Sequence, residues 1–356
     1  MIEKKFLKLC KDKAYFKQHR KVLLAISGGL DSMTLLNLLY KYQKELDIEL
    51  ILAHINHKQR IEANQEEKQL KEIAQKLGVK ILTSSFSGVF SEKSARDFRY
   101  NFFKKVMQEE DCTALVTAHH ADDQAETIFM RILRGSRLRY LSGMKDRQPF
   151  GGGELIRPLL EFSKTDFPTV FHFEDASNFE NTYFRNRVRN QYFPLLETEN
   201  PRIKQAIINL GTEIAQLQKA LSDLTKDLNQ NDLQTFRKQK REVQVFLLQE
   251  YLEKFPDLQL RKAQFDEILH ILNTKTNYHH YLKNQYELIQ DYQTFKIQKI
   301  GPKSDSKKDA ILLQFEDIIE LDNFCFSFGK ELVGGVVQMI PVSRKTSIVL
   351  RHRQSG

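Results

Sequence analysis

A short loop between a predicted strand and a predicted helix has the residue types of a phosphate-binding site. It follows the apolar run VLLAI and consists of Ser27, Gly28, Gly29, Leu30, Asp31 and Ser32. Two adjacent glycines allow positive φ angles and let backbone N–H groups approach an anion at the N-terminus of a helix. The sequence therefore predicts a phosphate cradle, although Asp31 and Ser32 could also serve only as helix caps.

The loop differs from a Walker loop, G-x-x-x-x-G-K-[ST], because it has no lysine to hold a γ-phosphate. A carboxylate such as that of Asp31 can lie beside phosphates when Mg²⁺ bridges the two groups, since both supply the oxygen ligands that this ion prefers. These features favour chemistry at the α-phosphate of ATP, with pyrophosphate as the leaving group.

A second candidate cluster lies in the stretch TAHHADDQAET at 117–127. Asp123 and Glu126 are three residues apart, and Asp122 and Glu126 are four apart, so these carboxylates can share one face of a helix. Acidic residues in a first helical turn often only complement the helix dipole. The adjacent His119 and His120 make metal binding or general base catalysis an alternative interpretation.

Polar and basic residues elsewhere have both functional and ordinary interpretations. His54 and Asn56, in the stretch HINH, could contact a base or could simply end a strand. Arg96 and Arg99 fall on one helical face, where arginines are usually only solvated. Basic residues interleaved with aromatic ones suit RNA, although the aromatic ones could equally be core. The predicted RNA-binding residues are Arg131, Arg134, Arg137, Arg185, Arg187 and Arg189, near Tyr183, Phe184, Tyr192 and Phe193.

The composition fits a globular protein with a polyanionic partner. The chain has 356 residues, enough for two or three domains, and a net charge of +9 that favours nucleic acid but would also suit an anionic membrane surface. No apolar run approaches the ~18 residues of a membrane span, and VLLAI is too short for a signal peptide, so a cytoplasmic protein is expected. The three cysteines lie far apart, without the C-x-x-C spacing of zinc or iron–sulfur sites.

The elements that must position these residues alternate in the manner of βαβ units. Strands are expected at 22–26, 50–55, 79–84 and 114–118, and crossover helices at 31–44, 63–77 and 93–110. On the third helix, Phe98, Phe102 and Val106 are expected to point inward. This order predicts an α/β fold with a doubly wound, mostly parallel sheet, whose ligand site lies at the carboxyl ends of the strands.

The second half of the chain has a different pattern. Asn200-Pro201 marks a boundary, after which 202–230 has the periodicity of a long helix despite Gly211. A helical region over 233–272, a hairpin or meander over 282–300 and short strand-like segments after a linker at 301–309 follow. Three parts are therefore expected: a domain with the candidate catalytic residues over 1–200, a connecting helix with a helical domain over 201–300, and a small C-terminal α+β region over 301–356.

Eight motifs together resemble those of one family. SGGLDS, HINH, ARDFRY, HHADDQAET, RGSRLRYLSGM, RPLL and EDASN followed by RNRVR occur in the order and spacing of bacterial tRNA(Ile)-lysidine synthetases, which belong to the PP-loop ATP pyrophosphatase superfamily. SGGLDS alone would indicate only the superfamily. The whole series covers about residues 22–190 and is specific to the family.

The resemblance implies a reaction in two steps. ATP adenylates the 2-carbonyl oxygen of the wobble cytidine in a CAU anticodon of tRNA(Ile), and the ε-amine of free lysine then displaces AMP. The C2 carbonyl carbon of cytosine is a poor electrophile until adenylation of its oxygen makes AMP the leaving group. An acidic pocket would orient the amine of lysine for its attack. His119, Asp122, Asp123 and Glu126 all remain candidates for the base that accepts the proton of the amine.

The resemblance also implies roles for matching residues. Residues 27–32 would form the pyrophosphate loop, with Mg²⁺ held by Asp31 and Asp123. His54 and Asn56 fall where the family lines its nucleotide pocket, Arg96 falls where it contacts ATP or the activated product, and Glu126 falls where it supports lysine or metal binding. The resemblance further implies that the helical domain over 201–300 binds tRNA and that residues 301–356 begin a C-terminal tRNA-recognition domain. A homodimer is compatible with this family.

Three features depart from the family pattern. Tyr140 stands where the family usually has glycine, and the family's helix between RPLL and EDASN is shortened here to FSKTDFPTVFHF, which Pro168 interrupts. The chain ends at RHRQSG, where family members generally continue, so the C-terminal region is expected to be incomplete.

Three other functions are less consistent with the sequence. The PP-loop tRNA thiolases related to this family have cysteine pairs, which are absent here. A non-catalytic ATP-gated RNA-binding module would not need the acidic cluster around Asp123. GMP or NAD synthetase chemistry would not account for the basic second half of the catalytic domain.

Overall fold

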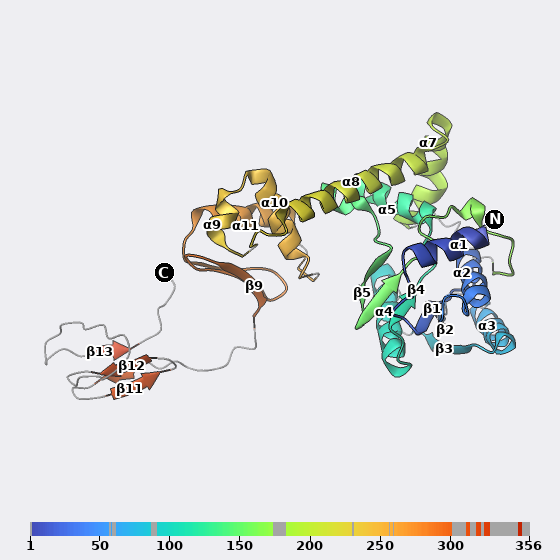
Figure 1. Ribbon diagram of the computed structural model, residues 1–356, viewed down its shortest axis with the longest axis horizontal. Helices are drawn as coiled ribbons and strands as arrows, with labels where there is room; N and C mark the ends of the chain where they lie inside the picture. Colours follow the sequence, from blue (N-terminus) through green and yellow to red (C-terminus); the bar gives the residue numbers. More distant parts are fainter. Residues whose placement is uncertain are drawn as a thin grey trace. The chain divides into compact units, whose positions relative to one another are not determined.

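The computed structural model describes residues 2–56, 58, 62–86, 91–173, 183–229, 231–255, 257–258 and 260–300, together with four later strands (Figure 1). The chain divides into two compact units, residues 1–220 and residues 221–356. The two units are described separately below.

A six-stranded sheet forms the centre of the first unit. Its order is β3-β2-β1-β4-β6-β5, and all neighbouring pairs are parallel except β5 with β6. The strands are β1 (Lys21–Ala25), β2 (Glu49–Asn56), β3 (Lys80–Ser85), β4 (Ala114–Val116), β5 (Arg147–Phe150) and β6 (Gly153–Ile156). The predicted doubly wound sheet is therefore confirmed, and the four predicted strands form its centre and one side.

Helices cover both faces of this sheet (Figure 1). Successive side chains of β1 point to opposite faces of the sheet, and both faces are apolar. Leu24 packs with Leu35 and Leu39 on one face, whereas Leu23 packs with Val106 on the other. The helices are α1 (Ile2–Asp12), α2 (Leu30–Tyr42), α3 (Ala63–Leu77), α4 (Glu92–Glu109) and α5 (Ala121–Leu133). The three predicted crossover helices correspond to α2, α3 and α4.

The inward stripe predicted for α4 is only partly correct. Val106 is buried, but Phe98 and Phe102 are half-buried, and Phe103 occupies the fully buried position beside the sheet. Phe98 instead packs edge to face against Phe86 just after β3, with ring centroids 5.3 Å apart. The packing face of α4 is therefore rotated by about one residue from the face that the sequence suggested.

The edge hairpin formed by β5 and β6 was not predicted from the sequence. Its strands are joined by Gly151 and Gly152, whose φ angles of 60° and 86° lie in the left-handed region. Gly153 follows in β6, and a Cβ atom there would overlap the backbone carbonyl of Thr113. This close approach brings β6 beside β4 and extends the sheet by two strands.

Gly153→Ala is expected to destabilise the first unit by about 2–4 kcal/mol, because the added methyl group meets backbone that cannot move aside independently. Gly152→Ala is the matched control, since its Cβ would meet nothing within 4 Å and only the left-handed backbone would be strained, at a cost of about 1 kcal/mol. Urea unfolding of both variants measures the difference. Equal losses would show that the contact with Thr113 is unimportant.

Further short helical segments and most of α8 complete the described part of the first unit. These segments are η1 (Leu138–Ser142), η2 (Lys164–Asp166), α6 (Phe184–Arg187), the single π-helical turn η4 (Val188–Tyr192), α7 (Phe193–Glu199) and α8 (Ile203–Thr225). α8 confirms the predicted long helix. Gly211 lies where a Cβ would be 2.6 Å from Ile128 Cδ1, so its lack of a side chain lets α8 approach α5 closely.

Over residues 231–300, the described part of the second unit consists of α9, α10 and α11 and a three-stranded antiparallel sheet, which confirms the predicted helical region and meander. These elements are α9 (Leu233–Lys238), α10 (Arg241–Leu252), α11 (Lys262–Thr274), β7 (Tyr278–Tyr281), β8 (Tyr286–Gln290) and β9 (Phe295–Lys299). Phe236, Leu248, Ile268, Leu288 and Phe295 form the middle of its core.

Later strands form two further antiparallel pairs, β10 (Ile311–Leu313) with β13 (Ile348–Leu350) and β11 (Ile318–Leu321) with β12 (Phe324–Ser327). The predicted linker at 301–309 and the segment at 336–340 lie outside the described residues. Across the helices that the structure describes, none is both long enough and apolar enough to span a membrane.

Candidate active site

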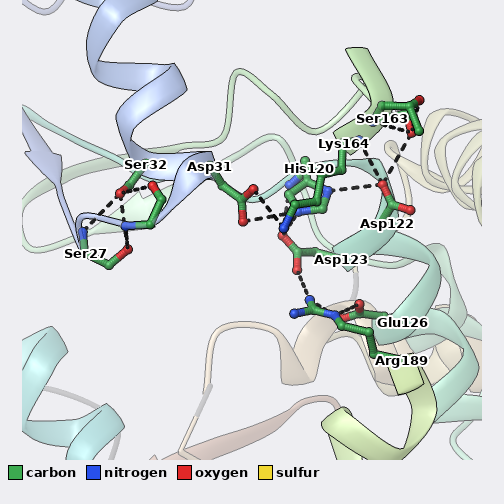
Figure 2. A network of polar contacts seen from close by, with 12 residues as sticks. Ser27, Asp31, Ser32, His120, Asp122, Asp123, Glu126, Ser163, Lys164 and Arg189 are labelled. Carbon is green, nitrogen blue, oxygen red and sulfur yellow. Dashed lines mark hydrogen bonds and ion pairs between the residues drawn. The ribbon is translucent and has the colours of Figure 1, made fainter. Parts of the chain in front are cut away.

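The candidate active site lies at the carboxyl ends of β1 and β4, where a doubly wound sheet binds its ligands (Figure 2). The loop after β1 leads into α2 and carries Asp31, and the loop after β4 leads into α5 and carries Asp123 and Glu126. Because β1 and β4 are paired in the sheet, two clusters that are about ninety residues apart in sequence meet in space.

The loop at 27–32 is closed around the hydroxyl group of Ser32. The backbone N–H groups of Ser27 and Gly28 donate to Ser32 Oγ at 3.2 and 3.1 Å, and this hydroxyl donates to the carbonyl oxygen of Gly29 at 3.0 Å. Gly28 has a φ of 87°, and α2 starts after Gly29 without a side-chain cap. The loop thus has the converging N–H groups and uncapped helix start of an anion site.

The segment FSKTDFPTVFHF at 162–173 lies against this loop. Phe173 donates its backbone N–H to the carbonyl oxygen of Gly28 at 2.9 Å, and its ring occupies the space where a Cβ of Gly28 would be. Between Phe162 and Phe173 the only helical segment is the short η2, so the predicted interruption of the helix in this region is confirmed. The absence of a side chain at Gly28 therefore allows Phe173 to cover the loop.

His120 connects the carboxylates from the two loops (Figure 2). Its Nε2 atom lies 3.5 Å from Asp31 Oδ2 and 3.5 Å from Asp123 Oδ2, and its Nδ1 atom lies 3.4 Å from Asp122 Oδ2. The imidazole is 2% exposed and packs edge to face on Phe167. Burial opposes its positive charge, but the three carboxylates outweigh burial and raise the pKa of His120 to about 9.

The protonated His120 is expected to stabilise the fold at neutral pH. Because its pKa of about 9 exceeds the ordinary value of 6.5, this contribution is complete below pH 6.5 and is lost as the pH rises through about 9. The difference corresponds to at most about 3 kcal/mol. Urea unfolding in the presence of a chelator, at about pH 6 and about pH 10, should show a larger loss for wild type than for His120→Gln; parallel losses would contradict the assignment.

Asp122 has a positioning role in the structure. Its Oδ2 atom accepts the backbone N–H of Lys164 at 3.0 Å and lies 3.5 Å from Ser163 Oγ, and Lys204 Nζ lies 3.4 Å from Oδ1. The contact with His120, despite burial, lowers the pKa of Asp122 well below its ordinary value. The carboxylate thus ties the 163–164 segment to the start of α5, and Lys164 Nζ in turn lies 3.5 Å from Asp31 Oδ1.

Two arginines pair with the acidic residues of α5. Arg185 lies 2.7 Å from Glu126 Oε2 through Nε and 2.8 Å from Asp123 Oδ1 through Nη2. Arg189 lies 2.7 Å from Glu126 Oε1 through Nε and 3.3 Å from Asp123 Oδ1 through Nη2. Glu126 is almost fully buried, so these charge-assisted contacts compensate for its loss of water. Two residues predicted to contact RNA therefore lie in the acidic site in this structure.

Other predicted site residues lie around this centre. His119 Nδ1 is 2.9 Å from Thr117 Oγ1, and burial lowers the pKa of His119 to about 4, so its ring is neutral at pH 7. His54 donates from Nδ1 to the carbonyl oxygen of Ile26 at 3.0 Å, and burial lowers its pKa.

Asn56 and Arg96 have ordinary contacts in the structure. Asn56 donates to Asn64 Oδ1 and Glu67 Oε2, both at 3.0 Å, and so holds the start of α3. The exposed guanidinium of Arg96 lies 4.9 Å above the ring of Tyr100. The predicted nucleotide contacts of Asn56, Arg96 and His54 remain predictions.

The remaining predicted RNA-binding arginines do not join the acidic centre. Arg131 Nη1 donates to the carbonyl oxygens of Gly143, at 2.8 Å, and of Tyr140. The guanidinium groups of Arg134 and Arg187 lie over the ring of Phe184 at 5.2 and 5.6 Å. Arg137 precedes η1. Of the aromatic residues in doubt, Phe193 is core, whereas Phe184 is half-buried beneath the arginines.

His120 was named in the sequence only together with His119 and was given no role of its own, and Lys164 was not predicted as a site residue. A signal for His120 was present, because it lies in the short loop between β4 and α5 and directly precedes α5, but its neighbour His119 lies in the same loop. Lys164 is more than 130 residues from Asp31 in the sequence, and no pattern connects the two.

The oxygen atoms available at the centre suit Mg²⁺. Asp31 Oδ1 is buried without a hydrogen-bond partner, and Asp31 and Asp123 approach the same nitrogen of His120. Among the described residues no set of three or more ligating side chains forms a metal cage. Mg²⁺ is commonly held by one or two carboxylates together with substrate phosphates, so two carboxylates beside an anion-binding loop fit this ion.

Comparison with known proteins gives consistent results. Residues 1–196 match a family model described as PP-loop domain. A tRNA(Ile)-lysidine synthase from Streptococcus gordonii is 96% identical over 356 residues, covering 100% of this chain and 84% of that protein. The protein of the same name from Streptococcus sanguinis is 62% identical with the same coverage.

Among solved structures, a U34-tRNA thiolase from Methanococcus maripaludis with its [4Fe-4S] cluster matches with a TM-score of 0.47 and 18% identity. The match covers 59% of this chain and 78% of that chain. The family model and the two relatives, which match over the whole of this chain, confirm the resemblance found in the motifs. The chain belongs to the tRNA(Ile)-lysidine synthase family of PP-loop proteins.

Proposed function

We propose that this protein uses ATP to join free lysine to the 2-carbon of the wobble cytidine in the CAU anticodon of tRNA(Ile), releasing pyrophosphate and AMP. The observation that carries the proposal is the meeting of Asp31 and Asp123 beside a loop suited to an anion, with Asp31 Oδ1 buried, without a hydrogen bond and 3.5 Å from Lys164 Nζ. Membership of the family supports the substrate, and the geometry supports reaction at the α-phosphate.

In the first step, cytidine O2 attacks the α-phosphorus of ATP, the bond to the β-phosphate oxygen breaks and pyrophosphate leaves. The N–H groups that now point to Ser32 Oγ, and the uncapped start of α2, would bind the departing phosphates. Asp31 and Asp123 would hold Mg²⁺, which supplies positive charge to the phosphates when bound. Lys164, near Asp31, adds a second cation at the same place.

In the second step, the lysine ε-nitrogen bonds to C2 of the cytidine, and the bond from C2 to the adenylated oxygen breaks to release AMP. Glu126 and Asp123 form the acidic pair that would receive the amine. Their present partners, Arg185 and Arg189, neutralise the pair, so lysine has to share or replace these contacts. His119 is neutral at pH 7 and lies beside this pair, but it is a weak base because burial lowers its pKa to about 4.

A direct assay tests the proposal. Purified protein is incubated with ATP, isotopically labelled lysine and unmodified tRNA(Ile), and lysine incorporation is compared with the release of AMP and pyrophosphate. The expected result is one AMP and one pyrophosphate for each lysine incorporated, with no incorporation into a methionine tRNA that also has a CAU anticodon. RNA binding without incorporation would instead support a non-catalytic role.

The assembly state is a separate part of the proposal. The family is compatible with a homodimer, and sedimentation of the purified protein tests for one.

A further inference from the structure

A groove of about 450 Å³ runs between α4 and the edge strand β5, away from the acidic centre. Arg96, Tyr100 and Lys104 line one wall, and Gln148 and Phe150 line the other. The three residues of α4 are four apart, so they lie on one face and span about 12 Å along the helix. In Figure 1, α4 and β5 lie side by side at the end of the sheet.

Positive groups and aromatic rings alternate along this groove. The Arg96 guanidinium lies over the ring of Tyr100 at 4.9 Å, and Lys104 Nζ lies over the ring of Phe150 at 5.5 Å. The two rings meet edge to face, with centroids 5.5 Å apart. Rings beside cations form the pattern that binds single-stranded nucleic acid, because bases stack on the rings while phosphates approach the cations.

The charge behind the groove is also positive. Asp97 is the one acidic residue among the lining side chains, against two cations. Behind Gln148 lies Arg157, which is 5% exposed and donates to Gln148 Oε1 at 3.3 Å and to the carbonyl oxygen of Lys145 at 2.6 Å. No carboxylate of the described residues is within ion-pair distance of Arg157, and its Nε has no partner. Arg157 is buried near Arg96 as well as near Asp146, so its charge is only partly balanced and favours an anion in the groove.

The groove also leads towards the proposed active site. α4 follows β3, so its N-terminal turns, which carry Arg96, lie at the sheet edge that holds Asp31 and Asp123. The charge of Arg96 is close enough to His119 to affect its protonation. A strand that leaves the active site along α4 would therefore meet Arg96 first, then Tyr100, and then Lys104 with Phe150.

We propose that this groove binds a single-stranded segment of the RNA substrate, namely the loop nucleotides next to the modified cytidine. The proposal rests on the proposed function for the identity of the RNA. A duplex would fit less well, because paired bases present no free face to Tyr100 and Phe150.

The first test exchanges one charge inside the groove and one outside it. Lys104→Glu changes a lining residue, whereas Lys105→Glu changes the next residue, which is exposed, does not line the groove and pairs weakly with Glu109 at 3.7 Å. Both variants change the net charge equally. Lys104→Glu is expected to weaken binding of a CAU anticodon stem-loop RNA about tenfold, and Lys105→Glu less than about twofold. Equal losses would overturn the proposal.

The second test concerns stacking. Phe150→Leu keeps an apolar side chain but removes the ring. Removing the loop bases beside the target cytidine should weaken binding to wild type about tenfold or more, and should have a much smaller effect on Phe150→Leu. If the abasic RNA loses equal affinity for both proteins, no base stacks in the groove. Thermal unfolding of each variant confirms that the fold is retained.

Two controls separate this proposal from the proposed function. If Lys104→Glu weakens the binding of free ATP and not that of the RNA, the groove is a nucleotide site and the proposal fails. If wild type incorporates no lysine but Lys104→Glu still binds the stem-loop less tightly than Lys105→Glu does, the proposed function fails and the RNA groove stands.

Discussion

Asp31→Asn is expected to reduce pyrophosphate release at least about a thousandfold, equivalent to about 4 kcal/mol of transition-state stabilisation. The asparagine has the same shape but no negative charge. It therefore weakens the proposed metal site and the contact with His120, whose Nε2 lies 3.5 Å from the carboxylate. Pyrophosphate release in the presence of tRNA and ATP, without lysine, measures the first step alone. The affinity for tRNA should remain within about twofold, because Asp31 contributes no positive charge to RNA.

Asp47→Asn is the matched control for this variant. Asp47 pairs with Arg20 at the opposite edge of the sheet, and both side chains are exposed, so the change is expected to have little effect on stability or activity. If magnesium-dependent turnover is unchanged in Asp31→Asn, Asp31 does not hold the metal and serves only to cap the helix. Large losses in both variants would indicate a general effect of removing a carboxylate.

Glu126→Gln is expected to separate the two steps of the reaction. The amide retains one oxygen acceptor but loses the charge that Arg185 and Arg189 now share, and with it the charge that would attract the lysine ammonium group. Lysine transfer should fall at least about a hundredfold, whereas pyrophosphate release without lysine should fall no more than about threefold. Quenched-flow measurement of both products tests this difference.

Loss of stability is a competing explanation for this second variant, because Glu126 is almost fully buried in an ion-paired cluster. Glu154→Gln provides the comparison, since Glu154 pairs with Arg147 and with His19 in a different part of the first unit. Urea unfolding of both variants gives the cost of losing a paired glutamate. If Glu126→Gln slows both steps in proportion, the residue supports the fold or the metal and does not act specifically on lysine.

The sequence predicted the fold well wherever an element has a clear apolar pattern, on one face or on both. β1 and its neighbours were recognisable because they are buried on both faces, and α8 was recognisable because its periodicity continues through Gly211. The edge hairpin was missed because Pro149 and the glycines at 151–153 are typical of a loop. The close approach of Gly153 to the backbone of Thr113, which places β6 beside β4, is not visible in the sequence. The exact packing face of α4 was missed for a related reason, because Phe102 and Phe103 are both aromatic and either could have faced the sheet.

The site was predicted in its acidic residues but not in their partners. Glycine and carboxylate motifs are local in sequence, so Asp31 and Asp123 could be identified and placed at one sheet edge. Arg185 was predicted to contact RNA because it lies among aromatic residues. No local sequence pattern indicates that it pairs with Glu126, which is 59 positions earlier in the chain. Partners that are distant in sequence become visible only when the folded chain brings them together.

The Ser32 hydroxyl inside the loop at 27–32 also bears on how fast and how tightly a nucleotide can bind. Because one oxygen atom accepts from the N–H groups of both Ser27 and Gly28, the loop itself holds these two groups in place. The conformational entropy of ordering this loop is therefore lost when the chain folds and not when ATP arrives. Association then exchanges one oxygen acceptor for another in a preorganised loop, so its rate should depend on diffusion of the nucleotide and not on a slow closure of residues 27–32.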